Sequence, residues 1–519
     1  MTDWSLLSSP LFGIEGAGGV RSHATLPGLL AMLSAGEKTE MTSLQAHQHH
    51  AWHAFVVQLA AIALERAQLT EPPTAEATWR AALRTAAARE GVDPDHAFEL
   101  VVSDLKQPAF MQPPVPEGTL ATLKSVHTTP SAELDVLITA KNHDVKMTPI
   151  ATPTAEHWVY ALVVLQTMQG FLGAGNYGIA RMNGGFASRP CVAFAPSPRE
   201  SDRFLRDLRA LRAARASLCE GKRYDATGPA LLWCLPWDGK TSLAIHTLDP
   251  FFVEVCRRVR LADDDGRIIA HRGSSKVARI DASELAGNTG DPWTPVTRDG
   301  KALTLQSGFS YERVRECVFG DYQHGAAGSM RPDGDRFWVG QVMVRGQGKT
   351  GGYHERWIPV PPRVRDIFAE PTARDALARR AQAWVDRAAK ARLSVLKPAI
   401  LAFLQGGPEE LKFDDPRANA ALEAYQSAID DRFFSLLFGT AGATPEEADA
   451  EFELLLLHLA KQQLERAFDA LPTPVARRHR AMAAAERALY GAARKHLSRT
   501  MPSNQPSVDP TPSTDGDTS

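Results

Sequence analysis

The sequence predicts an α+β protein with a large mixed α/β body over residues 1–365, a four-helix bundle over residues 366–500 and a disordered tail over residues 501–519. Three observations predict this organisation. Helical and strand-like segments are interspersed irregularly up to about residue 365, and the composition then changes to Ala, Leu, Arg and Glu. The last residues are rich in Ser, Thr, Pro and Asp, a composition that cannot form a packed core. With 519 residues, of which 44% are hydrophobic, the chain is long enough for more than one domain.

The body is predicted to combine helices with short strands. Ser197-Pro198-Arg199-Glu200 has the pattern of a capping box with proline at the first helical position, so a helix is expected to begin there. Other helices are expected over residues 43–68, 76–90 and 157–169. Strand-like runs occupy residues 191–194, 231–235, 251–260, 267–271, 302–305 and 337–344. Asp263-Asp264-Asp265 lies between two of these runs and is interpreted as a hairpin tip rather than a metal site.

The bundle is predicted from four long helical stretches separated by glycine and proline. These stretches cover residues 373–404, 416–438, 445–471 and 474–499. Thr444 followed by Pro445 and two glutamates is an N-cap with acidic residues at the positive end of the helix. Since the connections are short, the four helices are expected to pack antiparallel.

The bulk composition excludes several classes of protein. The net charge of −2 means that binding to nucleic acid would have to come from local basic patches. The five cysteines form no Cys-x-x-Cys pair, so we expect no structural zinc and a reducing, cytoplasmic location. The start of the chain lacks the pattern of a secretory signal, and the apolar runs are too short to span a bilayer, so no membrane partner is expected.

The most informative stretch is the glycine-rich run of residues 345–356, which contains Gly348-Lys349-Thr350. A phosphate-binding P-loop would need glycine where Met343 stands and a helix after Thr350, but the following residues read as extended. A flexible loop with Arg345, Gln347 and Lys349, placed after an apolar strand, instead suits close approach to a phosphodiester backbone or to base edges.

A second glycine run, Gly173 to Gly178, formally matches Gly-x-Gly-x-x-Gly. A dinucleotide site would need a strand before it and a helix after it, whereas here a helix precedes and more loop follows. Two interpretations stay open: a purely structural turn, or a loop that presents its backbone to a ligand or nucleic acid.

Three further clusters have both an ordinary and a functional interpretation. The histidines are expected on a solvated or partly buried helix face, with a metal pair as the alternative. Each arginine cluster is either a salt-bridged surface or a phosphate-binding patch. The clusters are His47, His49, His50 and His53; Arg203, Arg206, Arg209, Arg212 and Arg215; and Arg477, Arg478, Arg480, Arg487, Arg494, Lys495 and Arg499. No nucleophile–base pair or paired carboxylates stand out, so no catalytic residue, metal ion or cofactor is predicted.

Several segments, in order, resemble the CasA family, the large subunit of the type I-E CRISPR complex Cascade. They are Pro108 to Pro113, Leu137 to Lys146, Phe171 to Pro190, Gly290 to Pro295, Arg345 to Pro359, and the closing Lys495-His496-Leu497. The layout of an α/β body followed by a four-helix bundle is similar too, so the resemblance covers nearly the whole chain.

The resemblance implies a non-enzymatic subunit of an RNA-guided antiviral surveillance complex. Such a subunit recognises the protospacer-adjacent motif in duplex DNA, promotes strand opening and R-loop formation, and recruits a helicase-nuclease; sequence reading is left to the guide RNA. The implied partners are the crRNA, the double-stranded target DNA, the helicase-nuclease, and the backbone, 5′-handle-capping and small subunits of Cascade.

The resemblance also implies roles for individual residues. The glycine loop that meets the minor groove corresponds to Gly173, Gly175, Asn176, Tyr177 and Gly178. The lysine finger corresponds to Lys276, with Arg279 as the alternative, and the strand-separating wedge to Gln347, Gly348, Lys349 and Thr350. Lys141, Asn142, His143 and Asp144 correspond to the loop that docks near the guide RNA.

The sequence departs from the family in two ways. Some relatives have paired cysteines in the middle of the body, which are absent here. Some have Gln at the wedge position where this sequence has Thr350, with Gln347 offset by three, and this difference leaves the wedge residue open. Two other functions stay as alternatives: a nucleotide-dependent enzyme that uses the Gly-Lys-Thr loop, and a helical scaffold with no role in DNA binding.

Overall fold

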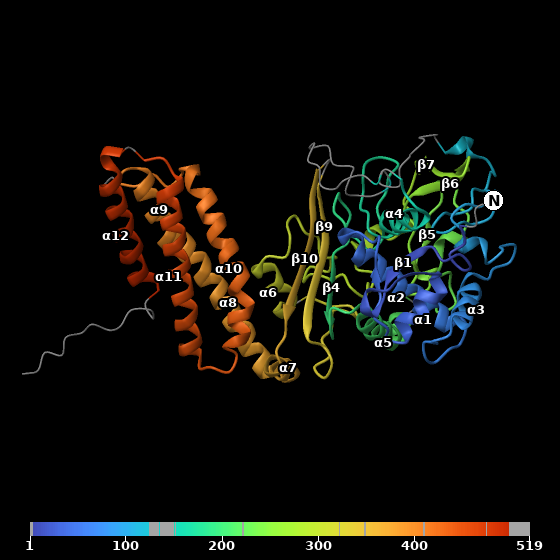
Figure 1. The fold of residues 1–519 in the computed structure, drawn as a ribbon, viewed down its shortest axis with the longest axis horizontal. Helices are drawn as coiled ribbons and strands as arrows, with labels where there is room; N and C mark the ends of the chain where they lie inside the picture. The colour runs from blue at the N-terminus through green and yellow to red at the C-terminus, as the bar shows by residue number, and fades with distance from the viewer. Residues whose placement is uncertain are drawn as a thin grey trace, which may run out of the picture. The chain divides into compact units, whose positions relative to one another are not determined.

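The computed structural model describes residues 4–123, 134, 150, 152–220, 223–320, 322–346, 349–407, 410–473 and 475–497 (Figure 1). The predicted docking loop Lys141 to Asp144 and the tip residues Gln347 and Gly348 lie outside these residues. The chain divides into two compact units, Met1–Glu370 and Pro371–Ser519, and each is described by itself.

The first unit mixes helices with short sheets, as the sequence predicts. Its helices are α1 (Leu26–Ser34), α2 (His49–Arg66), α3 (Glu76–Ala87), α4 (Ala155–Thr167), α5 (Glu200–Cys219), α6 (Tyr311–Phe319) and α7 (Pro362–Ala369). Its strands are β1 (Phe12–Glu15), β2 (Arg21–Ala24), β3 (Glu40–Met41), β4 (Cys191–Ala195), β5 (Leu243–Ala244), β6 (Arg258–Asp264), β7 (Arg267–Gly273), β8 (Ile280–Asp281), β9 (Phe337–Gly346) and β10 (Lys349–Pro359).

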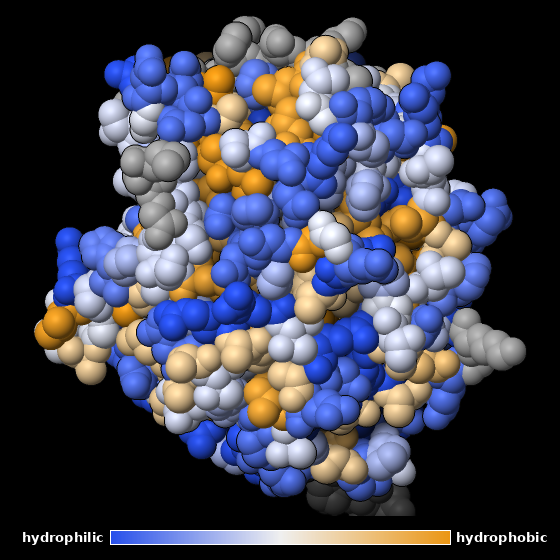
Figure 2. Space-filling model, turned by 90° about the vertical axis from the view of Figure 1, so that its right-hand side faces the viewer, coloured by the Kyte–Doolittle hydropathy of each residue, from blue (hydrophilic) through white to orange (hydrophobic). Residues whose placement is uncertain are grey.

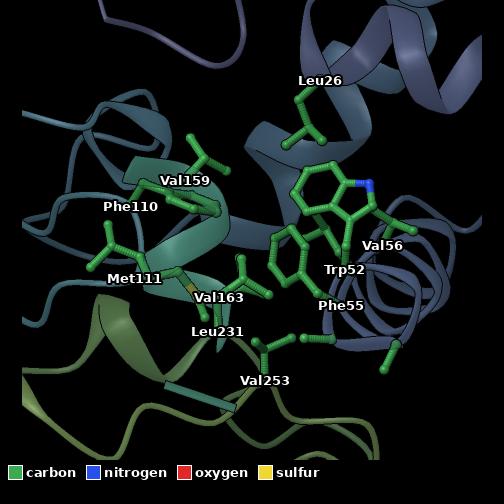
Figure 3. Packing of buried hydrophobic residues seen from close by; sticks show 14 of the residues in the cluster. Leu26, Trp52, Phe55, Val56, Phe110, Met111, Val159, Val163, Leu231 and Val253 are labelled. Carbon is green, nitrogen blue, oxygen red and sulfur yellow. The ribbon is translucent and has the colours of Figure 1, made fainter. Parts of the chain in front are cut away.

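Helix α2 forms the centre of this unit. Its residues are buried on almost every side, which is expected of a helix that is apolar all round. The ring of Phe55 lies 5.6 Å from that of Phe110, and Trp52 lies in the same cluster (Figure 3). The ring of Trp52 also lies 5.1 Å from Tyr160 on α4, and Phe110 contacts Trp233. These contacts join segments that are far apart in the sequence, so the core can form only when the whole unit folds.

The described strands form four small sheets. Their orders are β2-β1-β3, β10-β9-β4, β5-β8 and β6-β7, and only the β5-β8 pair is parallel. The β6–β7 hairpin turns at Asp265 and Gly266, which both have positive φ, as two-residue hairpin turns require. The interpretation of Asp263 to Asp265 as a hairpin tip is therefore confirmed.

The second unit contains four antiparallel helical stretches. The first runs through α8 (Pro371–Lys390), a short π-helical segment (Ala391–Leu396) and α9 (Lys397–Leu404), and it is followed by α10 (Asn419–Gly439), α11 (Pro445–Ala470) and α12 (Arg478–His496). The π-helical segment ends two residues before Pro398, whose missing N–H interrupts the regular hydrogen-bond pattern of a helix. Thr444 and Glu447 form a reciprocal capping box at the start of α11, so the predicted N-cap is confirmed.

Some predictions for local elements are wrong. Leu231 to Leu235 is not a strand, because residues 232–234 form a 3-10 turn that buries Trp233. Residues 302–305 make one isolated bridge only, and residues 251–257 come before β6 rather than in it. The capping box at Ser197 does not form, because Ser197 Oγ donates to Asp202 and α5 begins at Glu200.

The surface is mixed in character. On the side shown in Figure 2, hydrophobic residues lie in small groups between hydrophilic ones. Hydropathy alone therefore does not identify a binding face, and the candidate site has to be located from the geometry of its loops.

Candidate nucleic-acid interface

The glycine run from Gly173 to Gly178, the glycine loop, forms a compact loop after α4. Gly173 and Gly175 have φ of +110° and +84°, values that side chains rarely allow. The loop closes on itself through the bond from Asn176 N to the carbonyl oxygen of Gly173, 2.9 Å, and that from Leu172 N to the carbonyl oxygen of Asn176, 2.9 Å. A dinucleotide site needs a strand before the loop and a helix after it, but here helix α4 comes before and strand β4 is the next regular element after. The Rossmann interpretation is therefore excluded.

Close backbone packing explains the glycines at the ends of this loop. A Cβ at Gly178 would lie 2.7 Å from the carbonyl carbon of Gly170, and one at Gly170 would lie 2.5 Å from the carbonyl oxygen of Ala187. Two backbone segments therefore approach each other more closely than any side chain permits. Residues 170–187 fold as one double loop that contains both glycine clusters.

The guanidinium of Arg257 holds the two ends of the glycine loop together. Nη2 donates to the carbonyl oxygen of Gly170 at 2.7 Å, and Nη1 donates to that of Tyr177. Gln166 on α4 fixes the backbone of this arginine, because its Oε1 accepts from Arg257 N at 2.8 Å. The arginine is buried, so it supports the loop from behind.

The segment that carries Lys276 is attached to the same loop. Ser275 N donates to the carbonyl oxygen of Gly175 at 3.0 Å, and the hydroxyl of Tyr177 donates to the carbonyl oxygen of Lys276 at 2.9 Å. A sequence separation of 99 residues is thereby closed. The structure brings together two of the residue groups that the sequence assigned to DNA binding.

Tyr177 and Gly178, at the end of the glycine loop, and Lys276 line one hollow with a volume of about 740 Å³, whereas Gly173, Gly175 and Asn176 are not among its lining residues. Residues 183–185 of the second glycine cluster line it too, as do residues 277, 278 and 280–283. Lys276 is exposed, and no ion pair or hydrogen bond of its ammonium group occurs among the described residues. The hollow thus presents backbone groups, the Lys276 cation and the carboxylate of Asp281, and the backbone groups and the cation can meet a nucleic-acid backbone or groove.

Arg279, the alternative to Lys276, points into the protein. Its guanidinium donates to the carbonyl oxygens of Leu235 and Pro236, at 3.1 and 3.3 Å, and stacks over Trp237. Burial lowers the pKa of Arg279 to about 10. The geometry therefore favours Lys276 as the cation that faces solvent.

Lys349 and Thr350 lie at the end of a long β-hairpin. The β9 and β10 strands pair from Phe337↔Pro359 to Gly346↔Lys349, with a bulge between Thr350 and Gly352. Since a strand and not a helix follows Thr350, the P-loop interpretation is wrong. Arg345, expected among the cations of this loop, is buried.

The hairpin extends beyond its sheet. Strand β4 pairs with β9 only from Phe337 to Gln341, so the last five residues of β9 pair with β10 alone. At ~3.4 Å per residue, this two-stranded part is roughly 17 Å long. Its base is anchored, because the ring of Tyr353 on β10 stacks on His50 of α2 with 5.5 Å between centroids.

The histidine and α5 arginine clusters are internal only in part: Arg209 is exposed and Arg203 and Arg212 are half-buried, whereas other members are buried. His50 is buried with no hydrogen-bond partner for either ring nitrogen among the described residues, and His53 contacts Asp207 at 2.9 Å. Arg206 binds Asp335 at 2.7 Å and Arg215 binds Asp249 at 2.7 Å. These side chains organise the body, so the phosphate-binding interpretation of the α5 arginines is wrong for Arg206 and Arg215.

The basic end of the chain is exposed, in contrast. Arg480, Arg487 and Arg494 recur every seven residues along α12 and are all exposed, so they form one stripe on the helix. Arg478 is used within the unit, where it donates to the carbonyl oxygen of Phe468. Arg499 lies outside the described residues.

Sequence reasoning missed a buried ionic network behind the glycine loop. Asp291 accepts a hydrogen bond from Arg189 at 2.8 Å and lies 3.5 Å from Arg181, which also pairs with Glu254 at 3.2 Å. The carboxylate of Glu254 accepts from Ala180 N as well. The only sequence signal was the segment around Asp291, which was noted for its resemblance and not for its chemistry.

The described residues contain neither a metal-binding cluster nor a membrane-spanning helix. No group of three or more His, Cys, Asp or Glu side chains is arranged to hold a metal ion. No helix is both long and apolar enough to cross a membrane.

Comparison with known proteins identifies the fold. No protein-family model and no curated protein matches the sequence. Among solved structures, Cse1 from Acidimicrobium ferrooxidans is similar with a TM-score of 0.62 and 15% identity, over 97% of this chain and 100% of that chain. CasA (Cse1) from Thermus thermophilus is similar with a TM-score of 0.61 and 15% identity, over 95% of this chain and 100% of that chain. The chain has the CasA (Cse1) fold.

A structure described as a CRISPR RNA-guided surveillance complex contains a further chain with this fold. It is 14% identical, with a TM-score of 0.58, and the match covers 95% of this chain and 100% of that chain. The resemblance to CasA drawn from short sequence segments is thus confirmed at the level of the fold, over nearly the whole length.

Proposed function

We propose that this protein is the non-catalytic large subunit of an RNA-guided surveillance complex of the Cascade type. It senses a short motif in duplex DNA next to the target, promotes strand opening, and recruits the helicase-nuclease. The observation that carries the proposal is the meeting of the glycine loop and Lys276 at one hollow, within a CasA fold.

The chemistry of the hollow suits relaxed recognition of a short motif. The minor groove offers a degenerate pattern, mostly acceptors from A·T pairs, with one additional donor from G·C pairs. Glycine lets backbone groups approach the groove closely, and Lys276 supplies a positive charge without a fixed plane of hydrogen bonds. Such a site distinguishes classes of base pairs and leaves the reading of the target to the guide RNA.

The β9–β10 hairpin is suited to act as the wedge. Opening base pairs costs about 1.4 kcal/mol per step, and a rigid ribbon that enters the duplex can offset part of that cost. The ribbon is anchored by the stack of Tyr353 on His50, and the Gly346↔Lys349 pair is the last at its end. The exposed stripe of Arg480, Arg487 and Arg494 on α12 adds a surface for DNA phosphates.

The decisive experiment replaces Lys276 in the assembled complex. Complexes with Lys276→Ala are compared with the unmodified complex on a library of duplex targets whose flanking positions are randomised. We expect the preferred flanking motif to lose about tenfold in R-loop rate relative to the other sequences. Lys301→Ala, which removes an exposed lysine that pairs with Asp299, is the matched control. Motif preference that is the same in all three complexes would refute the proposal.

The wedge and the docking loop are tested separately. Changing Gln347 and Lys349 together to Ala should leave assembly intact and slow R-loop formation on duplex targets, but not on targets whose first base pairs are already open. Replacing Lys141, Asn142, His143 and Asp144 with Gly and Ser should release the subunit from the crRNA-loaded complex. Normal co-purification after that replacement would contradict the docking role.

A further inference from the structure

The hydroxyl group of Tyr177 binds the backbone of the Lys276 segment. It donates to the carbonyl oxygen of Lys276 at 2.9 Å. The ring itself packs against Phe171, 6.0 Å between centroids, and Phe171 packs against Phe186 at 5.7 Å. The tyrosine is therefore held on both its ring and its hydroxyl group.

Lys276 depends on these contacts because its own segment has little regular structure. Residues 274–279 connect β7 to β8 and form no strand pairs of their own. Three hydrogen bonds hold the backbone around the lysine instead. Lys276 N donates to the carbonyl oxygen of Gly239 at 2.6 Å, and the carbonyl oxygen of Lys276 accepts from the hydroxyl of Tyr177. The neighbouring Ser275 N donates to the carbonyl oxygen of Gly175. Two of the three come from the glycine loop.

The single hydrogen-bond donor of a tyrosine side chain limits the further bonds that Tyr177 can make. A phenol has a single O–H donor, and here that donor is used by the Lys276 carbonyl. The floor of the minor groove at A·T pairs presents acceptors only. While the bond to Lys276 persists, Tyr177 has no donor left for those acceptors.

We propose that Tyr177 is a positioning residue: it fixes the backbone of Lys276, and its influence on DNA recognition passes through that lysine. The glycine loop and the lysine finger then work as one preformed unit, so less conformational freedom is lost when DNA binds. This inference rests on the proposed function, since it assumes that Lys276 meets DNA.

A double-mutant cycle in the assembled complex tests the inference. The R-loop rate on a duplex with the preferred motif is measured for the unmodified protein, Tyr177→Phe, Lys276→Ala and the double variant. Loss of one hydrogen bond should slow Tyr177→Phe by about threefold to tenfold. In the Lys276→Ala background, however, the same change should have no further effect.

A second readout distinguishes positioning from general loosening. The slope of log rate against log salt concentration should fall when Lys276 is removed, because a cation in the groove also displaces counterions from the DNA. Tyr177→Phe should shift this slope toward the Lys276→Ala value. Tyr322→Phe is the matched control, because its hydroxyl bonds to Glu316 at 2.9 Å within another part of the body, and it should change neither quantity.

Each outcome decides a different point. If the two substitutions slow the reaction independently, Tyr177 contacts DNA directly and the inference is wrong. If Tyr177→Phe is silent while Lys276→Ala is slow, the inference is wrong and the proposed function stands. If Lys276→Ala itself has no effect, the proposed function fails and the inference fails with it.

Discussion

The glycine loop and the β9–β10 hairpin, the two regions assigned to DNA, are stabilised in opposite ways. The hairpin is held along most of its length by pairing between neighbouring strands, from Phe337↔Pro359 to Gly346↔Lys349. The loop has no strand partner and is held by distant residues, chiefly Arg257 and the Ser275–Lys276 segment. The stability of the loop should therefore be sensitive to substitutions far away in sequence, whereas the stability of the hairpin end should respond mainly to local ones.

The largest expected effect comes from removing the buried clamp of the loop. Arg257→Met removes the hydrogen bonds to the carbonyl oxygens of Gly170 and Tyr177 and leaves both without this charged donor. Hydrogen bonds to charged groups contribute roughly 1.5–3 kcal/mol each, so the opening free energy of residues 170–178 should fall by about 4 kcal/mol. Hydrogen exchange of the full chain measures this quantity segment by segment.

The same measurement shows whether the effect is confined to the loop. The exposed Arg267 on β7 provides the control, and Arg267→Met should change the opening free energy by less than about 0.5 kcal/mol. Exchange in β9 and β10 should remain normal in both variants. An equal loss of protection in the hairpin would mean that the two regions are not independent.

The second effect concerns the anchor of the hairpin and depends on pH. Burial, with neighbouring His47 and Arg189, lowers the pKa of His50 to about 3 from 6.5. Because the folded-state pKa lies below the unfolded value, the unfolded state takes up the proton first. The contribution to stability is complete above pH 6.5 and is lost as the pH falls toward 3, by up to ~1.4 kcal/mol per pH unit.

A matched pair of variants isolates this histidine. His50→Phe keeps an aromatic ring against Tyr353 and removes the titrating group, so its unfolding free energy should fall about 3 kcal/mol less than the unmodified protein's between pH 6.5 and pH 4. His246→Phe changes an exposed histidine and should keep the original pH profile. Urea unfolding of the full chain at a series of pH values gives both curves; parallel profiles for all three proteins would contradict the assignment.

The third effect compares one glycine in each region. A Cβ at Gly178 would lie 2.7–2.8 Å from backbone atoms of Gly170, while Gly346 on β9 has nothing within 4 Å. Gly178→Ala should therefore destabilise the loop by roughly 2 kcal/mol through overpacking. Gly346→Ala should be neutral or stabilising by about 0.5 kcal/mol, because it restricts the unfolded chain. Equal effects on the two regions would refute the close-approach account.

The same contrast explains how much the sequence could predict. The hairpin was predictable because its signal is local: an apolar run, a glycine-rich turn and a second extended run that together specify pairing between neighbours. The bundle was predictable for the same reason, since its caps and breaks, such as Thr444 and Pro445, lie beside the helices they define.

The supports of the loop could not be predicted from the sequence. Nothing near Arg257 indicates that it holds Gly170 and Tyr177, because the contact spans 80 residues or more and depends on the finished fold. The arginines of α5 misled for a related reason. Both sequence interpretations placed them on the surface, but Arg206 and Arg215 are held inside by Asp335 and Asp249, carboxylates that are distant in sequence.

The smallest expected effect lies in the hairpin bulge. Gly352 has φ of +96°, a conformation that costs a non-glycine residue about 1 kcal/mol, and a Cβ there would meet nothing within 4 Å. Gly352→Ala should therefore lower the opening free energy of β9 and β10 by about 1 kcal/mol without affecting residues 170–178. Hydrogen exchange can measure both regions in one experiment, with Gly346→Ala as the control for a glycine of ordinary φ on the partner strand. An unchanged opening free energy would mean that the bulge relaxes into regular pairing and does not contribute to stability. A decrease confined to β9 and β10 would show that the end of the hairpin is stabilised locally, as the strand pairing indicates.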